Sequence, residues 1–295
     1  MGTNEIYVRS VLNRHKRRDD WFLDDYSINP YSGCSFNCIY CYIRGSRYGG
    51  RGGLAAKVNA PAVLERELRR RARRGEYGFI ALSSATEPWM PSEEKYQLTR
   101  RCLEVISRFR FPVHCLTKST LSLRDLDLLK ELSGTAILPA DLKGRVSGVL
   151  FTVSISTLDE KAARVFEPRA PSPERRLDLV KEARDRGLQA GVAFIPVLPL
   201  ISDSREQLDE MAKAAREVDA CYTFFGLLTL QGAGKELYLK VLEKHYPEHV
   251  EEYRKLYRRG WSPSREYTGS FYKRALSACR RYKLKFGSIE VFKGD

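Results

Sequence analysis

No apolar run in this sequence of 295 residues approaches the ~20 residues that a membrane-spanning helix requires. The first residues, Met1 to Glu5, lack the apolar region of a secretory signal peptide. A disulfide framework fits poorly, because seven is an odd number of cysteines and a chain of this length can bury a large core without cross-links. We therefore expect a protein without membrane contact, with reduced cysteines, in the cytoplasm or an equivalent reducing compartment.

Acidic residues are too few to balance the basic ones. The chain has 51 Lys and Arg against 37 Asp and Glu, a formal net charge of +14 at pH 7. Such an excess suits a polyanionic partner, above all nucleic acid. The basic residues gather in segments 14–18, 66–74 and 254–259. A solvated helix face also explains segment 66–74, and many charges with little Asn and Gln are typical of thermophilic proteins, so charge alone leaves the partner open.

Three cysteines lie in one short segment, residues 29–42, with the spacing C-x3-C-x2-C. They are Cys34, Cys38 and Cys41, and the aromatic Tyr40 stands just before the last of them. Iron–sulfur clusters are usually held by four thiolates, so three thiolates without a fourth nearby would leave one iron open to an outside ligand. An open position distinguishes a reactive metal centre from a structural one. A zinc site is the alternative, and the nearest candidate for its fourth ligand, His15, lies well upstream.

Short apolar runs rich in β-forming residues alternate with segments of helical period. The runs cover residues 26–28, 79–82, 113–116, 149–155, 189–194 and 221–225, and the helical segments cover 92–106, 123–132, 172–187 and 207–218. Ser92 and Ser172 are expected as N-caps, with Pro173 at a first helical position. Strands alternating with helices form a parallel α/β sheet, here about two units short of a (β/α)8 barrel. We expect a basic N-terminal arm in residues 1–24, a partial barrel in 25–234 and a C-terminal helical extension in 235–295.

Polar residues follow the predicted strands repeatedly. Residues 83–88 follow the second strand, 117–119 follow the third, and 154–157 stand at the end of the fourth. In parallel α/β folds the carboxyl ends of the strands meet at one edge, where ligands bind. Several such clusters in order therefore indicate a single site, which includes the cysteine loop after the first strand.

The cysteine motif resembles that of the radical S-adenosylmethionine (SAM) superfamily, in which an aromatic residue typically precedes the last cysteine. The resemblance implies an α/β fold of the (β/α)6 partial-barrel type, which agrees with the strand count. It also implies that Cys34, Cys38 and Cys41 bind a 4Fe–4S cluster and that SAM chelates the open iron. An electron from an external donor such as ferredoxin or flavodoxin would then split SAM into methionine and a 5′-deoxyadenosyl radical.

A closer resemblance, over roughly residues 26–227, is to spore photoproduct lyase and its photolyase-like relatives. The segments that carry it are 29–34, 38–42, 86–89, 116–119, 153–155 and 166–173. The SAM-binding residues that it implies are Tyr40 beside the adenine, Glu87 for the amino group, Lys118 and Ser154 for the carboxylate, and Ser84, Thr86 and Ser156 next to them. Tyr40 and Tyr42 match the two tyrosines that flank the last cluster cysteine and are expected to be catalytic.

One position departs from this group. Spore photoproduct lyase repairs a methylene-bridged thymine dimer in DNA and uses a cysteine as hydrogen donor near the second-strand motif, where this chain has Ser84. A serine O–H is a poor hydrogen-atom donor compared with a thiol. Cys115 is the alternative donor, although we expect it to be a small buried hydrophobe, as we do Cys102, Cys221 and Cys279.

The sequence therefore predicts a radical SAM enzyme of the photolyase-like group, a lyase or modifying enzyme that acts on nucleic acid in the manner of DNA repair. It does not predict spore photoproduct repair itself. Radical modification of a peptide or small molecule is an alternative within enzymes. A non-catalytic iron–sulfur protein that binds nucleic acid is an alternative from another class, and SAM cleavage separates it from both enzymes.

Overall fold

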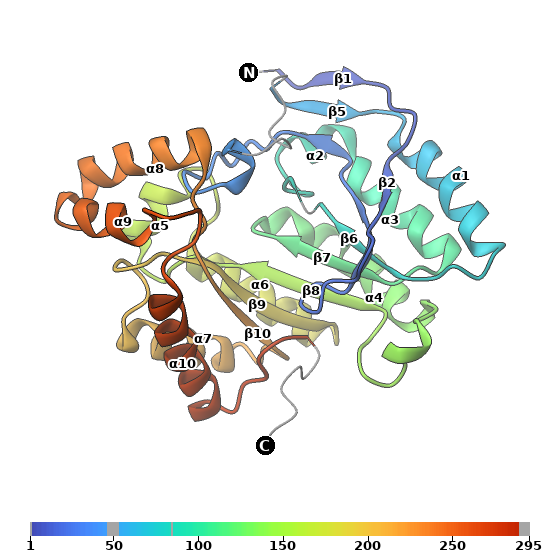
Figure 1. The fold of residues 1–295 in the computed structure, drawn as a ribbon. Coiled ribbons are helices and arrows are strands. Elements are labelled where there is room, and N and C mark those ends of the chain that lie inside the picture. Colours follow the sequence, from blue (N-terminus) through green and yellow to red (C-terminus); the bar gives the residue numbers. More distant parts are fainter. Residues whose placement is uncertain (1, 46–52, 84, 289–295) are drawn as a thin grey trace.

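The computed structural model describes residues 2–45, 53–83 and 85–288, and its main sheet is seven-stranded in the order β10-β9-β8-β7-β6-β3-β2 (Figure 1). The parallel strands are β3 (Asp24–Ile28), β6 (Phe79–Leu82), β7 (Val113–Thr117), β8 (Val149–Ser154), β9 (Gln189–Val197) and β10 (Thr223–Leu227). β2 (Leu12–Arg14) adds an antiparallel edge beside β3. Each predicted strand is present and lies parallel to its predicted neighbours.

Helices separate consecutive strands and cover the outer face of the curved sheet (Figure 1). They are α1 (Ala60–Ala72), α2 (Ser92–Tyr96), α3 (Leu98–Phe109), α4 (Leu126–Thr135), α5 (Glu160–Phe166), α6 (Pro173–Asp185) and α7 (Arg205–Glu217), with 3-10 turns η2 (Thr120–Asp125) before α4 and η3 (Ala140–Leu142) before β8. After β10 come α8 (Gly232–His245), η4 (Pro247–His249), α9 (Val250–Leu256) and α10 (Arg265–Arg281). The predicted (β/α)6 partial barrel with helices after it is confirmed.

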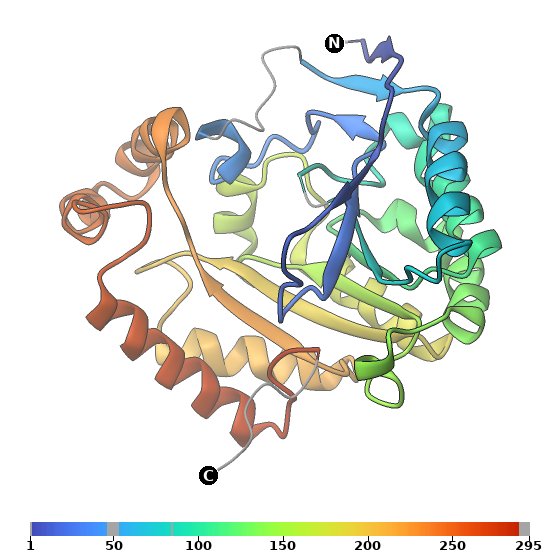
Figure 2. The same cartoon turned by 45° about the vertical axis from the view of Figure 1, so that its right-hand side comes forward.

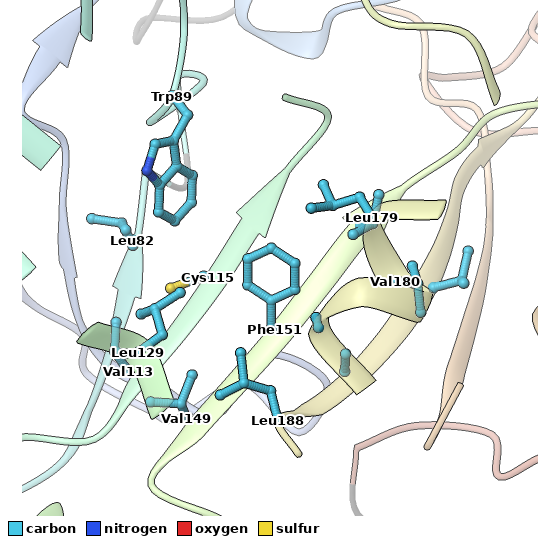
Figure 3. Close-up of a cluster of buried hydrophobic side chains, with 14 of the residues drawn as sticks. Leu82, Trp89, Val113, Cys115, Leu129, Val149, Phe151, Leu179, Val180 and Leu188 are labelled. Carbon is cyan, nitrogen blue, oxygen red and sulfur yellow. The ribbon is translucent and has the colours of Figure 1, made fainter. Parts of the chain in front are cut away.

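Successive side chains along each strand point alternately toward the helices, where they form the outer core, and toward the inside of the barrel. On β7, Val113 and Cys115 lie on the helix-facing side and belong to the cluster that contains Leu129 of α4 and Phe151 of β8 (Figure 3). All four side chains are fully buried. The outer core is thus built from every second residue of each strand.

The inside of the barrel holds a buried chain of polar groups. His114 Nδ1 lies 2.8 Å from the carbonyl oxygen of Phe22, which can only accept, so Nδ1 carries the proton. Burial lowers the pKa of His114 to about 4, so the ring is neutral and its Nε2 accepts from Thr152 Oγ1 at 2.6 Å. Thr152 in turn accepts from the Tyr222 hydroxyl at 2.7 Å. Gly191 leaves room for that tyrosine, because a Cβ at Gly191 would lie 2.4 Å from the Tyr222 ring.

The predicted helix over 92–106 is interrupted. Gln97 has a left-handed backbone (φ 48°) between α2 and α3, and Ser92 is the first residue of α2 without a capping side-chain bond. The buried carboxylate of Glu93 explains the break, because it accepts from the backbone amides of Thr99 at 2.9 Å and Arg100 at 3.1 Å. It therefore satisfies donors at the start of α3. The other expected cap is confirmed, since the Ser172 side chain accepts from the Arg175 amide and Pro173 begins α6.

The N-terminal segment takes part in both sheets. β1 (Asn4–Ile6) pairs in parallel with β5 (Ala55–Lys57), which also pairs with β4 (Tyr31–Ser32), and β2 extends the main sheet. Within the expected basic arm, residues 1–24, the strands β1 and β2 therefore pair with strands that come later in the chain. The division of the chain at residues 24 and 234 stays a prediction.

A turn at residues 19–23 connects β2 to β3 and lies on the open side of the partial barrel, which faces β10 (Figure 2). Trp21 stacks on Phe224 of β10 with ring centroids 5.6 Å apart, and Phe22 lies 5.7 Å from both Phe224 and His114. From the other end of the chain, the Ser288 hydroxyl donates to the carbonyl of Trp21 at 3.1 Å. The turn therefore supplies side chains where the sheet does not close on itself.

Across the ranges that the structure describes, no helix combines the length and the apolar character needed to cross a bilayer.

Candidate active site at the carboxyl ends of the strands

The cysteine loop runs from β4 to the 3-10 helix η1 (Tyr42–Gly45). Gly33 begins it in a left-handed conformation, with φ of 74°. A Cβ at this position would lie 2.8 Å from the carbonyl oxygen of Gly53, so only glycine fits the turn. The loop then passes over the barrel, where the Ile39 amide donates to the carbonyl of Phe166 at 2.8 Å.

A cavity of about 320 Å³ joins this loop to the carboxyl ends of the strands. Cys34, Cys38 and Cys41 all line it, and none of them forms a disulfide. Burial raises the pKa of the Cys34 thiol, and the nearby carboxylate of Glu87 adds to this effect. Burial also raises the pKa of Cys38 to about 12. A metal centre that binds here must therefore displace thiol protons.

The residues present fit a cluster held by the loop. The backbone amides of Phe36 and Glu87 partly oppose the rise in the pKa of the Cys34 thiol, because they favour its thiolate form. Within the described ranges, no three His, Cys, Asp or Glu side chains are close enough to share a single metal ion. A four-iron cluster tolerates a wider spacing, because each thiolate binds a different iron. The buried hydroxyl of Ser83 also lines the cavity and has no hydrogen-bond partner among the described residues, which suits a polar ligand.

Glu87 presents a buried carboxylate at the end of β6. It accepts from the Thr117 hydroxyl at 2.5 Å, from the Lys118 amide at 2.9 Å and from the Trp89 amide at 3.2 Å. Burial nevertheless raises its pKa above the ordinary range. The indole of Trp89 donates to Asp125 at 2.8 Å, and this bond anchors the segment that carries Glu87.

Lys118 and Ser154 lie together, as the resemblance implies. The Lys118 ammonium donates to Ser154 Oγ at 2.9 Å, and this hydroxyl donates to the carbonyl of Ile195 at 2.9 Å. The ammonium also lies 5.9 Å from the centroid of the Tyr40 ring. The ends of β7 and β8 and the cysteine loop thus place an ammonium, a hydroxyl and an aromatic face on one cavity.

Two site residues were missed by the sequence analysis. The Tyr40 hydroxyl donates to the buried carboxylate of Glu167, which also pairs with the buried guanidinium of Arg176 at 2.5 Å. Arg176 donates further to the carbonyl of Ser154 at 2.8 Å. Burial alone would raise the pKa of Glu167, but the positive charges of Arg176 and Lys118 outweigh it and hold that pKa below its ordinary value. Glu167 lay in a segment that carried the resemblance, yet no local pattern indicated its partner.

Of the other residues predicted to bind SAM or to act in catalysis, some line the cavity and others do not. Tyr42 and Thr86 line the cavity, and the Thr86 hydroxyl also reaches Asn29 Oδ1 at 3.5 Å. Ser156 is fully buried and does not line the cavity, so the structure does not bring it to the other SAM-binding candidates. Its hydroxyl has no partner within the described chain. Ser84 lies outside the described residues.

His15, the candidate for the fourth ligand of a zinc site, is not available to the cysteine loop. His15 Nε2 lies 2.9 Å from Ser27 Oγ and Nδ1 lies 2.9 Å from Asp24, so both ring nitrogens are engaged away from the cysteine loop. The other four cysteines do not line the cavity. Cys102, Cys115 and Cys279 are buried as expected, whereas Cys221 is half-buried. Because Cys115 faces the outer core (Figure 3), it cannot present its thiol to the cavity.

Comparison with known proteins adds the family. The model of the Radical SAM superfamily matches residues 28–215. An uncharacterised protein of Mycobacterium tuberculosis is 32% identical over 270 residues, which are 88% of this chain and 75% of that protein. Spore photoproduct lyase complexed with dinucleoside spore photoproduct superposes with a TM-score of 0.68 at 15% identity, over 96% of this chain and 80% of that one. Streptococcus suis SuiB bound to the precursor peptide SuiA gives a TM-score of 0.54 at 13% identity, over 90% and 48%.

The family match includes the cysteine loop, and the superposition on spore photoproduct lyase shows a shared fold. The family implies a 4Fe–4S cluster and SAM as cofactors. The chain belongs to the radical SAM superfamily and is an enzyme with the fold of spore photoproduct lyase.

Proposed function

We propose that this enzyme cleaves SAM reductively and uses the resulting radical on nucleic acid. The observation that carries the proposal is the shared cavity, where three free cysteines meet Glu87 and Lys118. Cys34, Cys38 and Cys41 would hold the cluster. When bound, the cluster and SAM supply an electron-driven cleavage to methionine and a 5′-deoxyadenosyl radical, which takes a hydrogen atom from the substrate.

Residues around the cavity would bind SAM and orient it. Glu87 offers a buried carboxylate to the SAM ammonium, and hydrogen bonds between charged groups are the strong ones. The Lys118 ammonium and the Ser154 hydroxyl donate to the SAM carboxylate, and Tyr40 offers its ring to the adenine. Tyr42, exposed at the opening, lies on the substrate side. The electron comes from an external reductant such as ferredoxin or flavodoxin.

Charge supports nucleic acid as the substrate class. The net charge of +14 favours a polyanion. The superposed spore photoproduct lyase is a complex with a dinucleoside, whereas SuiB, with the lower TM-score, is bound to a peptide. A peptide or small-molecule substrate is the second candidate.

The first experiment tests the cluster and the cleavage. Anaerobically reconstituted protein should bind about four irons per chain and, with dithionite, convert SAM to 5′-deoxyadenosine. Cys38→Ala should abolish iron binding, whereas Cys221→Ala, a half-buried cysteine outside the cavity, should leave it intact. Stoichiometric zinc without iron uptake, or no cleavage of SAM by the iron-loaded protein, would rule out this proposal.

A second experiment tests the substrate class. Single- and double-stranded DNA and RNA should change the rate of 5′-deoxyadenosine formation or take up deuterium from labelled SAM. If the whole panel leaves rate and label unchanged, thermal adaptation explains the charge and the peptide or small-molecule candidate leads. Because Ser84 replaces the donor cysteine, we expect spore photoproduct DNA to be repaired inefficiently.

A further inference from the structure

Large hydrophobic side chains are exposed at three positions in the described part of the chain: Tyr7, Tyr42 and Trp261. Tyr42 lines the cavity. Trp261 follows α9 in the connection to α10, and 62% of it is exposed. An indole that stays in water at this level is a candidate contact surface.

The backbone fastens Trp261 to the wall of the cavity. Leu230 donates its amide to the carbonyl of Trp261 at 2.7 Å, and the Tyr257 hydroxyl donates to the carbonyl of Leu228 at 2.8 Å. Leu228 lines the cavity together with the exposed Thr229. The segment 257–261 therefore lies against the strand-end residues 228–230 at the cavity opening.

The cysteine loop borders the same region. α8 packs against η1, whose first residue is Tyr42, and Figure 1 shows the end of α8 beside this blue turn. The exposed lining residues Tyr42 and Thr229 mark where the cavity opens. Tyr42 therefore lies at the opening itself, and the segment that carries Trp261 is bonded through its backbone to the residue after Thr229.

Two positive charges stand next to the indole. Arg258 and Arg259 are exposed, and neither forms an ion pair with any described residue, unlike the neighbouring Arg254, which pairs with Glu251 at 2.9 Å. Proteins that hold single-stranded nucleic acid combine aromatic faces for stacked bases with basic groups for phosphates. A duplex covers its base faces, so only an unpaired base can stack on an exposed indole.

We propose that Trp261, Arg258 and Arg259 form a rim platform that holds an unpaired nucleic-acid strand at the cavity opening. One base stacks on the indole, and the neighbouring phosphates pair with the two guanidinium groups. This inference rests on the proposed nucleic-acid substrate and adds where the strand is held and that it is unpaired there.

The test measures binding of labelled single-stranded oligonucleotides by fluorescence anisotropy at several salt concentrations. Trp261→Ala should weaken binding by roughly ten-fold or more, and Trp261→Phe, which keeps an aromatic face, should retain most of the affinity. The double variant Arg258→Ala/Arg259→Ala should reduce the slope of log K against log salt by about 1.4, for two lost phosphate contacts on a single strand. Quenching of tryptophan fluorescence by the oligonucleotide should disappear in Trp261→Phe, because Trp89 is buried and Trp21 half-buried.

The matched controls lie in α1 and just after β1, at residues that do not line the cavity. Arg66→Ala/Arg70→Ala removes the same charge from two exposed arginines of α1, neither of which pairs with a described acid, and Tyr7→Ala removes the remaining exposed aromatic residue. Both controls should bind nearly as wild type. Equal losses in the two double-arginine variants would mean diffuse charge and would overturn the platform, provided that circular dichroism shows all variants folded.

Two outcomes separate the platform from the proposed function. If oligonucleotides change 5′-deoxyadenosine formation but the rim variants bind like wild type, the platform is wrong and the function stands. If the rim variants lose binding but no oligonucleotide changes SAM chemistry, the platform stands and the substrate proposal falls. A polyglutamate peptide that binds as tightly as the oligonucleotide, with the same dependence on Trp261, would overturn nucleic acid as the occupant.

Discussion

Glu87 shows how one side chain can be held in place and still serve a ligand. A carboxylate has about four acceptor positions, and three donors from the protein already point at this one. One position is left for an ammonium. Burial raises the pKa of Glu87, and a cationic ligand next to it would lower that pKa again, because it favours the charged carboxylate.

We predict that Glu87→Gln weakens SAM binding by roughly ten-fold or more and leaves the iron content unchanged, because hydrogen bonds to charged groups are worth ~1.5–3 kcal/mol. Anaerobic equilibrium dialysis with the reconstituted protein measures both quantities. Glu94→Gln, an exposed acid of α2, is the control and should bind SAM normally. Wild-type affinity in the Glu87 variant would show that another group receives the amino end of SAM.

His114 makes stability depend on pH. Its pKa is lowered by burial to about 4, whereas in the unfolded chain it is ordinary, near 6.5. Between these values the unfolded state binds a proton that the folded state does not. Stability present above about pH 6.5 is therefore lost as the pH falls toward 4, by on the order of 3 kcal/mol in total.

We predict that His114→Asn is less stable than wild type at pH 7 but loses less stability between pH 6.5 and 4. Urea denaturation at a series of pH values measures the difference. The exposed His245 provides the control, and His245→Asn should follow the wild-type profile. A His114 variant with an unchanged acid profile would assign the pH dependence to other groups.

At the scale of elements, a buried ion pair ties the cysteine loop to the helices. Glu167 follows α5, Arg176 belongs to α6, and Tyr40 of the loop donates to Glu167. Both charged side chains are almost completely buried, so the attraction between them must offset the cost of removing each charge from water. The loop that carries the cysteines is thereby fixed to α5 and α6.

We predict that Glu167→Gln destabilises the protein by ~3–5 kcal/mol, because it leaves the Arg176 charge buried and unpaired. The variant should also take up less iron per chain on reconstitution. Glu160→Gln breaks the exposed pair with Arg164 on the neighbouring helix and should cost only about 0.3–0.5 kcal/mol. Similar losses in the two variants, measured by urea denaturation, would contradict this anchoring role.

At the scale of the whole molecule, the main sheet ends at β2 and β10, which do not pair with each other, and an early and a late segment of the chain meet between these edges. The turn at 19–23 places Trp21 against Phe224, and Ser288 binds the same turn. Figure 2 shows this dark-blue turn beside the lower end of the orange β10. These contacts therefore fill part of the gap between the two edges of the sheet with side chains.

We predict that Trp21→Ala lowers the free energy of unfolding by on the order of 2 kcal/mol, somewhat less than the ~3–5 kcal/mol of a fully buried aromatic residue. Its ring is half-buried and stacks on Phe224. Tyr7→Ala, at a residue that is 81% exposed, should have little effect in the same denaturation experiment. An equal response of the two variants would mean that the turn does not stabilise the barrel.

The sequence by itself determined the order of the strands and most of the site. Buried strands appear as short β-rich runs, and the carboxyl ends of parallel strands meet at one edge whatever the details of packing. The cysteine loop, Glu87, Lys118 and Ser154 could therefore be assigned to one site before any coordinates. The number of βα units followed from the same local patterns.

Only the tertiary structure decided which distant groups meet. Glu167 pairs with Tyr40 across 127 positions, and Ser288 reaches Trp21 across 267. Ser156 stands only two residues after Ser154, but it does not line the cavity. Local periodicity indicates which face of an element is buried, but contacts between remote side chains depend on how the elements pack, and packing leaves no periodic signal in the chain.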